Sequence, residues 1–349
     1  MKDEWKKYLE HTCGAVIENG SVIHFGNPEQ ELQVAKTGPI LMDLSNFGLI
    51  GVRGEDAQSF LQNMTCNDVR NIGETSSQIN ALVNPKGRIL ANFRLFKRLD
   101  TFYLQLPHDQ KEAVLKRLQM YVLRAKVEII DSSESFIRIG CTGPDITRLA
   151  QEAIQALPAK PNDVLHHDNL TLLHIPGLHP RYEILGKLED IKKIWERLNV
   201  HAAPVGSHIW RLHNIWAGIP AIYAATSEAF VPQMANFQEI GALSFTKGCY
   251  PGQEVVARSQ YLGKQKRRMY LCNTQSDTLP RPGESVFGAH TGEEGAVGKI
   301  VDAQPTPSGG CDLLAVLQID AAEHGRLHLG DAQGPEIKIN KLPYQWADH

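Results

Sequence analysis

The densest set of reactive groups in the chain lies between Lys247 and Glu254, where the sequence reads KGCYPGQE. This stretch combines an ammonium, a thiol, a phenol, an amide and a carboxylate. Its glycines and proline favour a loop, and the apolar run 255–257 that follows favours a short helix ending near Arg258. Backbone N–H groups at the start of such a helix carry a partial positive charge, so the loop could hold an anion or a thiolate.

Cys249 lies between Lys247 and the expected start of this helix. A neighbouring cation and a helix N-terminus both favour the thiolate, which is the form that acts as a nucleophile or metal ligand. One interpretation is therefore a reactive thiol with a nucleophilic, redox or ligand-exchange role. The other is a buried free cysteine that packs as a small hydrophobic side chain. The residues alone leave both open.

The octapeptide closely resembles the KGCYxGQE signature of the YgfZ-type folate-binding proteins, which are relatives of the glycine-cleavage T-protein (aminomethyltransferase). Weaker matches extend this resemblance over most of the chain. They lie at 51–69, 85–96, 217–220, 230–237, 256–258 and 341–344.

The resemblance implies an α+β, aminomethyltransferase-like fold with interlocked subdomains around a central opening, followed by a C-terminal antiparallel β-barrel. Independently of it, the composition changes after about Gly263, where short β-like runs alternate with glycine and proline. We therefore expect a folate-binding module of two interlocked subdomains over residues 1–263 and a β-barrel domain over residues 264–349.

Hydrophobic spacing predicts mixed helices and strands. The expected helices lie at 57–64, 114–122, 143–157 and 188–198. The expected strands of the first part lie at 79–83, 93–96, 102–106, 170–175 and 181–185, with a hairpin around Asn19-Gly20. Those of the last part lie at 269–272, 296–301, 313–319 and 336–339.

The resemblance also implies a bound reduced folate, tetrahydrofolate or a derivative. Trp210 matches a tryptophan linked to folate binding in the family, and its indole would stack on the pterin. Arg258 would lie near the folate carboxylates or the Cys249 loop, and Lys247, Tyr250, Gln253 and Glu254 complete the expected contacts. The alternatives are a core role for Trp210, although Trp216 fits a core position better, and a bare surface position for Arg258.

Glycine-cleavage chemistry needs a carboxylate beside the folate, which the T-protein supplies from an aspartate pair. The corresponding loop here is Asn84 to Arg88, and Ala91-Asn92 occupy the paired positions. Neither side chain can ionise, so a classical aminomethyltransferase is not expected. The resemblance implies instead a role in maintaining iron–sulfur enzymes, and through them tRNA modification. The alternatives are a folate-dependent one-carbon transferase acting on an unknown acceptor, and an interaction module with a vestigial folate site.

The whole chain carries a formal net charge of −3, so no overall field attracts it to nucleic acid or acidic lipid. Residues 247–268 are locally basic, with six lysines and arginines against Glu254 alone, and Tyr261 lies among them. This stretch could contact tRNA directly. It could equally be a solvated hinge, and no RNA-binding motif accompanies it.

The six cysteines form no CxxC pair, which fits free thiols in a reducing compartment. His166, His167, His174 and His179 lack metal-ligand spacing and are expected on the surface or in loops, so we predict no metal site. No apolar run is long enough for a membrane span, and the first residues are charged. These features predict a soluble cytoplasmic protein with no membrane partner.

Overall fold

The computed structural model describes residues 1–261, 265–288 and 295–346. The chain divides into two compact units. Unit 1 comprises Met1–Gln58, Arg70–Gln78 and Arg94–His213. Unit 2 comprises Ser59–Val69, Ile79–Phe93 and Asn214–His349. The boundary predicted at residue 263 is a different division of the chain, and it stays a prediction.

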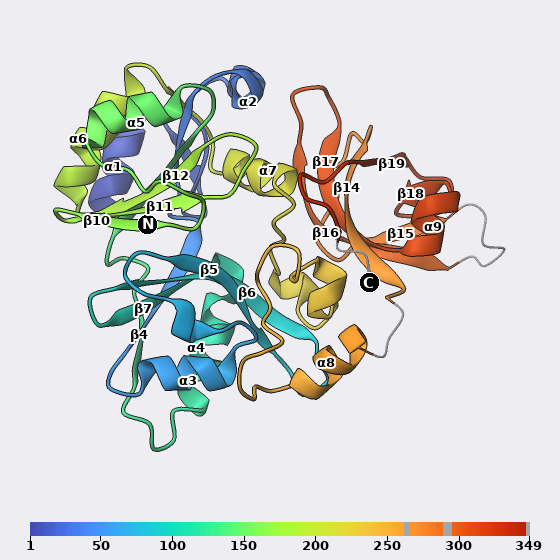
Figure 1. Ribbon diagram of the computed structural model, residues 1–349. Coiled ribbons are helices and arrows are strands. Elements are labelled where there is room, and N and C mark those ends of the chain that lie inside the picture. The colour runs from blue at the N-terminus through green and yellow to red at the C-terminus, as the bar shows by residue number, and fades with distance from the viewer. Residues whose placement is uncertain (262–264, 289–294, 347–349) are drawn as a thin grey trace. The chain divides into compact units, whose positions relative to one another are not determined.

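Unit 1 contains a six-stranded sheet of order β10-β11-β12-β9-β3-β13 (Figure 1). Its strands are Val164–His167 (β10), Leu170–Ile175 (β11), Arg181–Gly186 (β12), Ile137–Thr142 (β9), Ile40–Asp43 (β3) and Ala203–Pro204 (β13). Its helices are Asp3–His11 (α1), Pro28–Thr37 (α2), Lys111–Met120 (α4), Ile146–Ile154 (α5), Leu188–Asn199 (α6) and His208–Trp216 (α7), the last of which continues into unit 2.

The two faces of this sheet bury different cores because side chains alternate along a strand. Leu172 and Ile184 pack in one cluster with residues of α1, α5 and α6. Their neighbours Leu173 and Leu185 pack in a second cluster with Trp210 of α7. The sheet is therefore buried on both sides.

A second sheet has the order β5-β6-β7-β4-β8. Its strands are Ser77–Val83 (β5), Ile89–Arg98 (β6), Thr101–Pro107 (β7), Phe47–Arg53 (β4) and Glu128–Asp131 (β8). The other elements of the first half of the chain are the hairpin Val16–Glu18 (β1) and Ser21–His24 (β2), the helix Ala57–Met64 (α3), and the 3-10 turns Val69–Asn71 and His108–Gln110.

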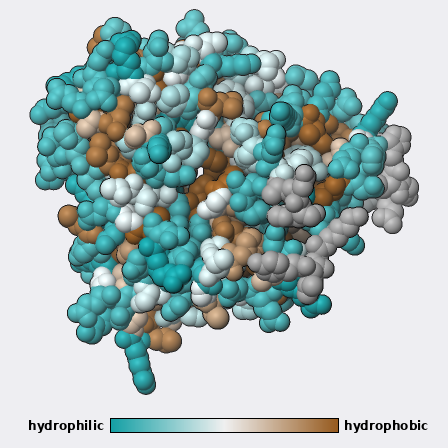
Figure 2. All heavy atoms as spheres, viewed as in Figure 1, coloured by the Kyte–Doolittle hydropathy of each residue, from teal (hydrophilic) through white to brown (hydrophobic). Residues whose placement is uncertain are grey.

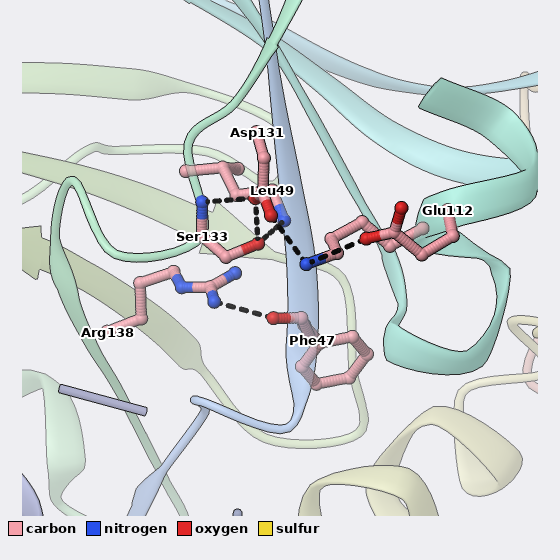
Figure 3. A network of polar contacts seen from close by, with 7 residues as sticks. Phe47, Leu49, Glu112, Asp131, Ser133 and Arg138 are labelled. Carbon is pink, nitrogen blue, oxygen red and sulfur yellow. Dashed lines mark hydrogen bonds and ion pairs between the residues drawn. The ribbon is translucent and has the colours of Figure 1, made fainter. Parts of the chain in front are cut away.

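Side chains complete the hydrogen bonding of β4 in this sheet (Figure 3). The Leu49 N–H donates to Oγ of Ser133 (3.1 Å), and the Phe47 carbonyl accepts from Nη2 of Arg138 (2.6 Å). Oγ of Ser133 in turn donates to Asp131 (2.6 Å), which also pairs with Lys111. Buried backbone groups need such partners, so these contacts fix the start of β4.

The last part of unit 2 is a closed antiparallel barrel of order β14-β17-β16-β15-β18-β19 (Figure 1). Its strands are Arg267–Thr274 (β14), Ser285–Gly288 (β15), Ala296–Pro305 (β16), Cys311–Gln318 (β17), Leu327–Leu329 (β18) and Glu336–Asn340 (β19), with the helix Ile319–His324 (α9) before β18. Unit 2 also holds the 3-10 turns Ala224–Thr226 (η3) and Pro232–Ala235 (η4) and the helix Gln253–Tyr261 (α8).

The structure confirms the α+β class, the C-terminal antiparallel barrel and the helices and strands expected from hydrophobic spacing. The hairpin turn is also confirmed, with positive φ at Asn19 (49°) and Gly20 (77°). His166 and His167 lie on the edge strand β10 and His174 on β11, and all three are partly exposed. Lys264 and the side chain of Tyr261, two members of the basic stretch, lie outside the described residues.

Hydrophilic residues make up most of the face seen in Figure 2, and hydrophobic ones lie there in small groups. Across the described ranges, no helix is both long and apolar enough to cross a membrane.

Candidate functional site

The KGCYPGQE loop belongs to unit 2 and alternates sharply in exposure. Lys247 is 4% exposed and Tyr250 is 7% exposed. Gly248 and Cys249, between them, are exposed. The chain is thus buried on both sides of the thiol and carries Cys249 to the surface, which favours the reactive interpretation over a buried hydrophobic one.

The ammonium of Lys247 points into the protein. Its Nζ donates to the carbonyls of Gln62 (2.6 Å), Thr65 and Asn67 (3.1 Å). Three acceptors match the three N–H groups of an ammonium. Lys247 was expected to contact a ligand, but its charge is taken up inside the protein, and we therefore leave it out of the folate contacts proposed below.

The side chain of Tyr250 is buried beside Lys247 and Cys66. Nζ of Lys247 lies 5.2 Å from the centre of its ring, a cation–π contact. Burial raises the pKa of the Tyr250 hydroxyl, with a further contribution from Cys66. Burial also raises the pKa of the Cys66 thiol to about 12, so Cys66 stays protonated beneath the loop.

The second half of the loop packs on the Asn84–Arg88 turn. A Cβ on Gly252, where φ is +81°, would lie 2.2 Å from the Asn84 carbonyl oxygen. A Cβ on Gly87 would likewise meet Val255 of α8 at 2.9 Å. Oδ1 of Asn84 holds the turn by accepting from the N–H groups of Lys86 and Arg88 (2.9 and 3.0 Å). Two motifs far apart in sequence are therefore in direct contact.

The remaining predicted residues of this stretch differ in exposure. Gln253 is half-buried, and its Nε2 donates to the Lys247 carbonyl (3.3 Å). Glu254 and Arg258 are exposed on α8. Nε2 of Gln233 fixes this helix by donating to the Val256 carbonyl (2.6 Å). Arg258 is thus the predicted cation that a ligand or partner can reach.

Ala91 and Asn92, at the positions compared with the T-protein aspartates, are both buried. Asn92 donates from Nδ2 to the Pro220 carbonyl (2.8 Å) and accepts at Oδ1 from the Ile222 N–H (2.8 Å). Both ends of the amide hold the chain together. These positions offer neither an acid nor a base.

Trp210 belongs to unit 1 and is 2% exposed. The Arg181 guanidinium lies over its ring, 4.2 Å from the ring centre. A Cβ on Gly140 would lie 2.7 Å from Cζ3 of the indole. Trp210 is therefore packed as a core side chain, whereas Trp216 is only half-buried and donates from Nε1 to Asp312 (2.7 Å).

The structure brings together Lys247, Cys249, Tyr250 and Gln253 within one loop of unit 2. Trp210 lies in the other unit. The sequence interpretation missed the role of Thr65, Cys66 and Asn67, which lie under the loop. Their only signal was their place in a weaker matching segment.

The chain matches the family model described as the GCVT N-terminal domain over residues 21–209. The solved structure of the glycine cleavage system aminomethyltransferase T from Bartonella henselae aligns with a TM-score of 0.78. That alignment covers 96% of this chain and 95% of that one at 16% identity, so it shows the fold alone. The expected aminomethyltransferase-like fold is confirmed.

Relatives found by sequence identify the family within this aminomethyltransferase-like fold. The tRNA-modifying protein YgfZ of Colwellia psychrerythraea is 36% identical over 306 residues, covering 87% of this chain and 93% of that protein. The YgfZ protein of Pectobacterium carotovorum is 29% identical over 318 residues, covering 91% and 95%. The chain belongs to the YgfZ family, as the KGCYPGQE motif predicted.

Proposed function

We propose that this protein supports iron–sulfur enzymes that modify tRNA, and that it does so through the thiol of Cys249 with a reduced folate bound. The relatives named above are called tRNA-modifying proteins, which supports a role of this protein in tRNA modification. The observation that carries the proposal is the exposure of Cys249 between buried Lys247 and buried Tyr250. A thiol held in this way can meet a partner protein without unfolding the loop.

A scaffold role is favoured over aminomethyl transfer. Asn92 is engaged at both ends of its amide, and Ala91 carries no polar group. A transferase needs a group that can move a proton or stabilise charge beside the folate. The positions compared with the T-protein supply none.

The described residues fit the tail of a folate better than its ring. Arg258 is exposed and can pair with a carboxylate. Trp210 offers almost no open surface, because Arg181 already lies over its ring. A pterin that stacks on this indole must displace the guanidinium. We therefore assign the folate a binding role and no chemical step.

The thiol is tested by complementation. In a strain lacking the gene, Cys249→Ser is expected to lose the activity of iron–sulfur tRNA-modifying enzymes, read as modified nucleosides by mass spectrometry of tRNA. Serine keeps the size and exposure but is a far weaker nucleophile and metal ligand. Cys311→Ser, at a buried barrel position, is the matched control and should complement. Wild-type nucleoside levels with Cys249→Ser would remove the thiol from the proposed function.

The folate is tested by binding. Tetrahydrofolate binding, followed by equilibrium dialysis, is expected to weaken about twofold to fivefold in Arg258→Gln, since an exposed ion pair with a folate carboxylate contributes up to about 1 kcal/mol. Arg148→Gln, which removes an exposed arginine of unit 1, is the control and should bind as the wild type does. Equal affinity in wild type and Arg258→Gln would remove Arg258 from the folate site.

A further inference from the structure

The Lys247 ammonium lies at the C-terminal end of α3. This helix ends at Met64, and its last carbonyls have no partners within the helix. The Gln62 and Thr65 carbonyls that accept from Nζ belong to this end. A helix C-terminus carries a partial negative charge, which a cation stabilises. Both the partial negative charge of this helix end and its carbonyl acceptors therefore stabilise the Lys247 ammonium.

The chain leading to Lys247 runs beside residues 65–67. Nδ2 of Asn67 donates to the Gly241 carbonyl (2.7 Å). The Cys66 carbonyl accepts from the Ser244 N–H (3.1 Å), and the Cys66 thiol lies 3.5 Å from the Ala242 carbonyl oxygen. Lys247 is the last of these contacts before Gly248 and Cys249.

Beyond Lys247 the loop loses this support. A Cβ on Gly248 would meet no atom within 4 Å outside the adjoining residues, so the side-chain position there is open. The chain is held again at Tyr250, which is buried, and at Gly252, which touches the Asn84 carbonyl. The thiol thus stands on a short exposed span between two fixed ends.

We propose that Lys247 is a positioning residue, whose ammonium binds the carbonyls of Gln62, Thr65 and Asn67 and so fixes the upstream end of the Cys249 span. The statement that Lys247 positions a functional thiol rests on the function proposed above. The binding of its ammonium to these three carbonyls, which we call the clamp, does not. Lys247 acts through the backbone and not by touching a substrate.

The clamp depends on the charge being fully paired. A buried ammonium is costly unless hydrogen bonds compensate for its lost hydration, and charge-assisted hydrogen bonds are stronger than neutral ones. Lys247→Met keeps the length of the side chain and removes all three donors. The carbonyls beneath the loop then lose their partner, and the loop gains by opening to water.

The test is hydrogen–deuterium exchange of the Ser244 and Gln253 amides, whose N–H groups donate to the Cys66 and Tyr250 carbonyls on either side of Cys249. In Lys247→Met these amides are expected to exchange at least about tenfold faster, since one hydrogen bond to a charged group is worth about that factor or more. The amides of β17 in the barrel should be unchanged, which separates a local effect from global destabilisation. Unchanged exchange of the Ser244 and Gln253 amides would overturn the proposal.

Lys86→Met is the matched control, since Lys86 is an exposed lysine of the neighbouring turn that packs against the loop. It removes the same charge without touching the clamp and should leave exchange of the Ser244 and Gln253 amides as in wild type. A loop equally loosened by Lys86→Met would mean that local charge, not the clamp, sets its order. That result would also overturn the proposal.

If Lys247→Met does not fold, Lys247→Arg decides. A guanidinium also donates several hydrogen bonds to carbonyls, so protection within about threefold of wild type is expected. A folded Lys247→Arg protein with an unprotected loop would contradict the clamp. Complementation tests the proposed function separately. If Lys247→Met loosens the loop but Cys249→Ser still complements the deletion strain, the proposed function is refuted and the clamp is supported.

Discussion

Single residues of unit 1 carry charges deep in the interior. Arg138, Arg181 and Glu183 are each at most 2% exposed. Burial lowers the pKa of Arg181 to about 9 and raises the pKa of Glu183, although nearby arginines oppose the latter shift. Nε2 of Gln105 supports Glu183 by donating to Oε2 (2.9 Å). Removing one member of such a group costs more than the group contributes as a whole, because the others stay buried without compensation.

His213 lies next to this group, and its burial predicts how the stability of the protein depends on pH. Burial lowers its pKa to about 3, with Arg181 contributing, whereas an unfolded histidine has a pKa of about 6.5. Between these values the unfolded state binds one proton more than the folded state, so stability falls as the pH falls from about 6.5 towards 3. His213→Gln is expected to lose this dependence, which amounts to about 1.4 kcal/mol per pH unit.

The measurement is the free energy of unfolding by guanidinium chloride at several pH values. Acidic groups titrate in the same range, so the quantity of interest is the difference between wild type and variant. His201→Gln, at an exposed position, is the control and should follow the wild-type curve. Parallel curves for wild type and His213→Gln between pH 6.5 and 4 would contradict the burial argument.

The sequence predicted the local structure of the site better than the direction of its side chains. A loop followed by a short helix was correctly expected from the glycines, the proline and the apolar run, whereas the exposure of Cys249 was left open. The inward direction of Lys247 was not, because its acceptors lie about 180 residues earlier in the chain. The packing of Trp210 was equally hidden, since Arg181 and Gly140 reach this residue of α7 from strands β12 and β9.

At the scale of elements, the contact between α8 and the Asn84–Arg88 turn depends on Gly252. Gly252→Ala is expected to destabilise the protein by about 2 kcal/mol or more. The new methyl group would meet the Asn84 carbonyl oxygen at 2.2 Å, and φ of +81° is itself unfavourable for alanine. The midpoint of guanidinium unfolding measures the loss.

Gly241→Ala is the control for this variant. Gly241 has a similar φ of +65° but open space where its Cβ would lie. It should therefore show only the backbone cost, about 1 kcal/mol. Equal destabilisation by the two variants would mean that the close approach of the two loops contributes nothing.

Elements with strong periodicity were predictable, and those with few apolar residues were not. Helix α5 buries five side chains at helical spacing and was expected. Helix α1 buries only Trp5 and Leu9 and was missed, as was α2, although Asn27 and Pro28 are capping signals. The short strands β13, β15 and β18 owe their existence to their partners in the sheet or barrel, which no local pattern shows.

At the scale of the whole chain, strands β14 and β17 of the barrel are buried on both surfaces. Side chains pointing inward, such as Tyr270 and Leu313, form the barrel core. Their neighbours Met269 and Leu314 point outward and pack in a cluster with Ile215 and other residues before the barrel. Unit 2 accordingly joins the barrel to the 214–261 region in one compact body.

The outward-facing residues make a test of the domain boundary predicted at residue 263. A fragment of residues 264–349 would expose Met269, Leu271, Leu314 and Val316, which are buried in the full chain. Full burial of such a side chain is worth about 1.5–3 kcal/mol, a large share of the stability of a small domain. We expect the fragment to lack a cooperative thermal transition by near-ultraviolet circular dichroism, while a fragment of residues 214–349 retains more native signal. A cooperative transition in 264–349 alone would establish residue 263 as a true domain boundary and show that the outer face of the barrel does not need its cover.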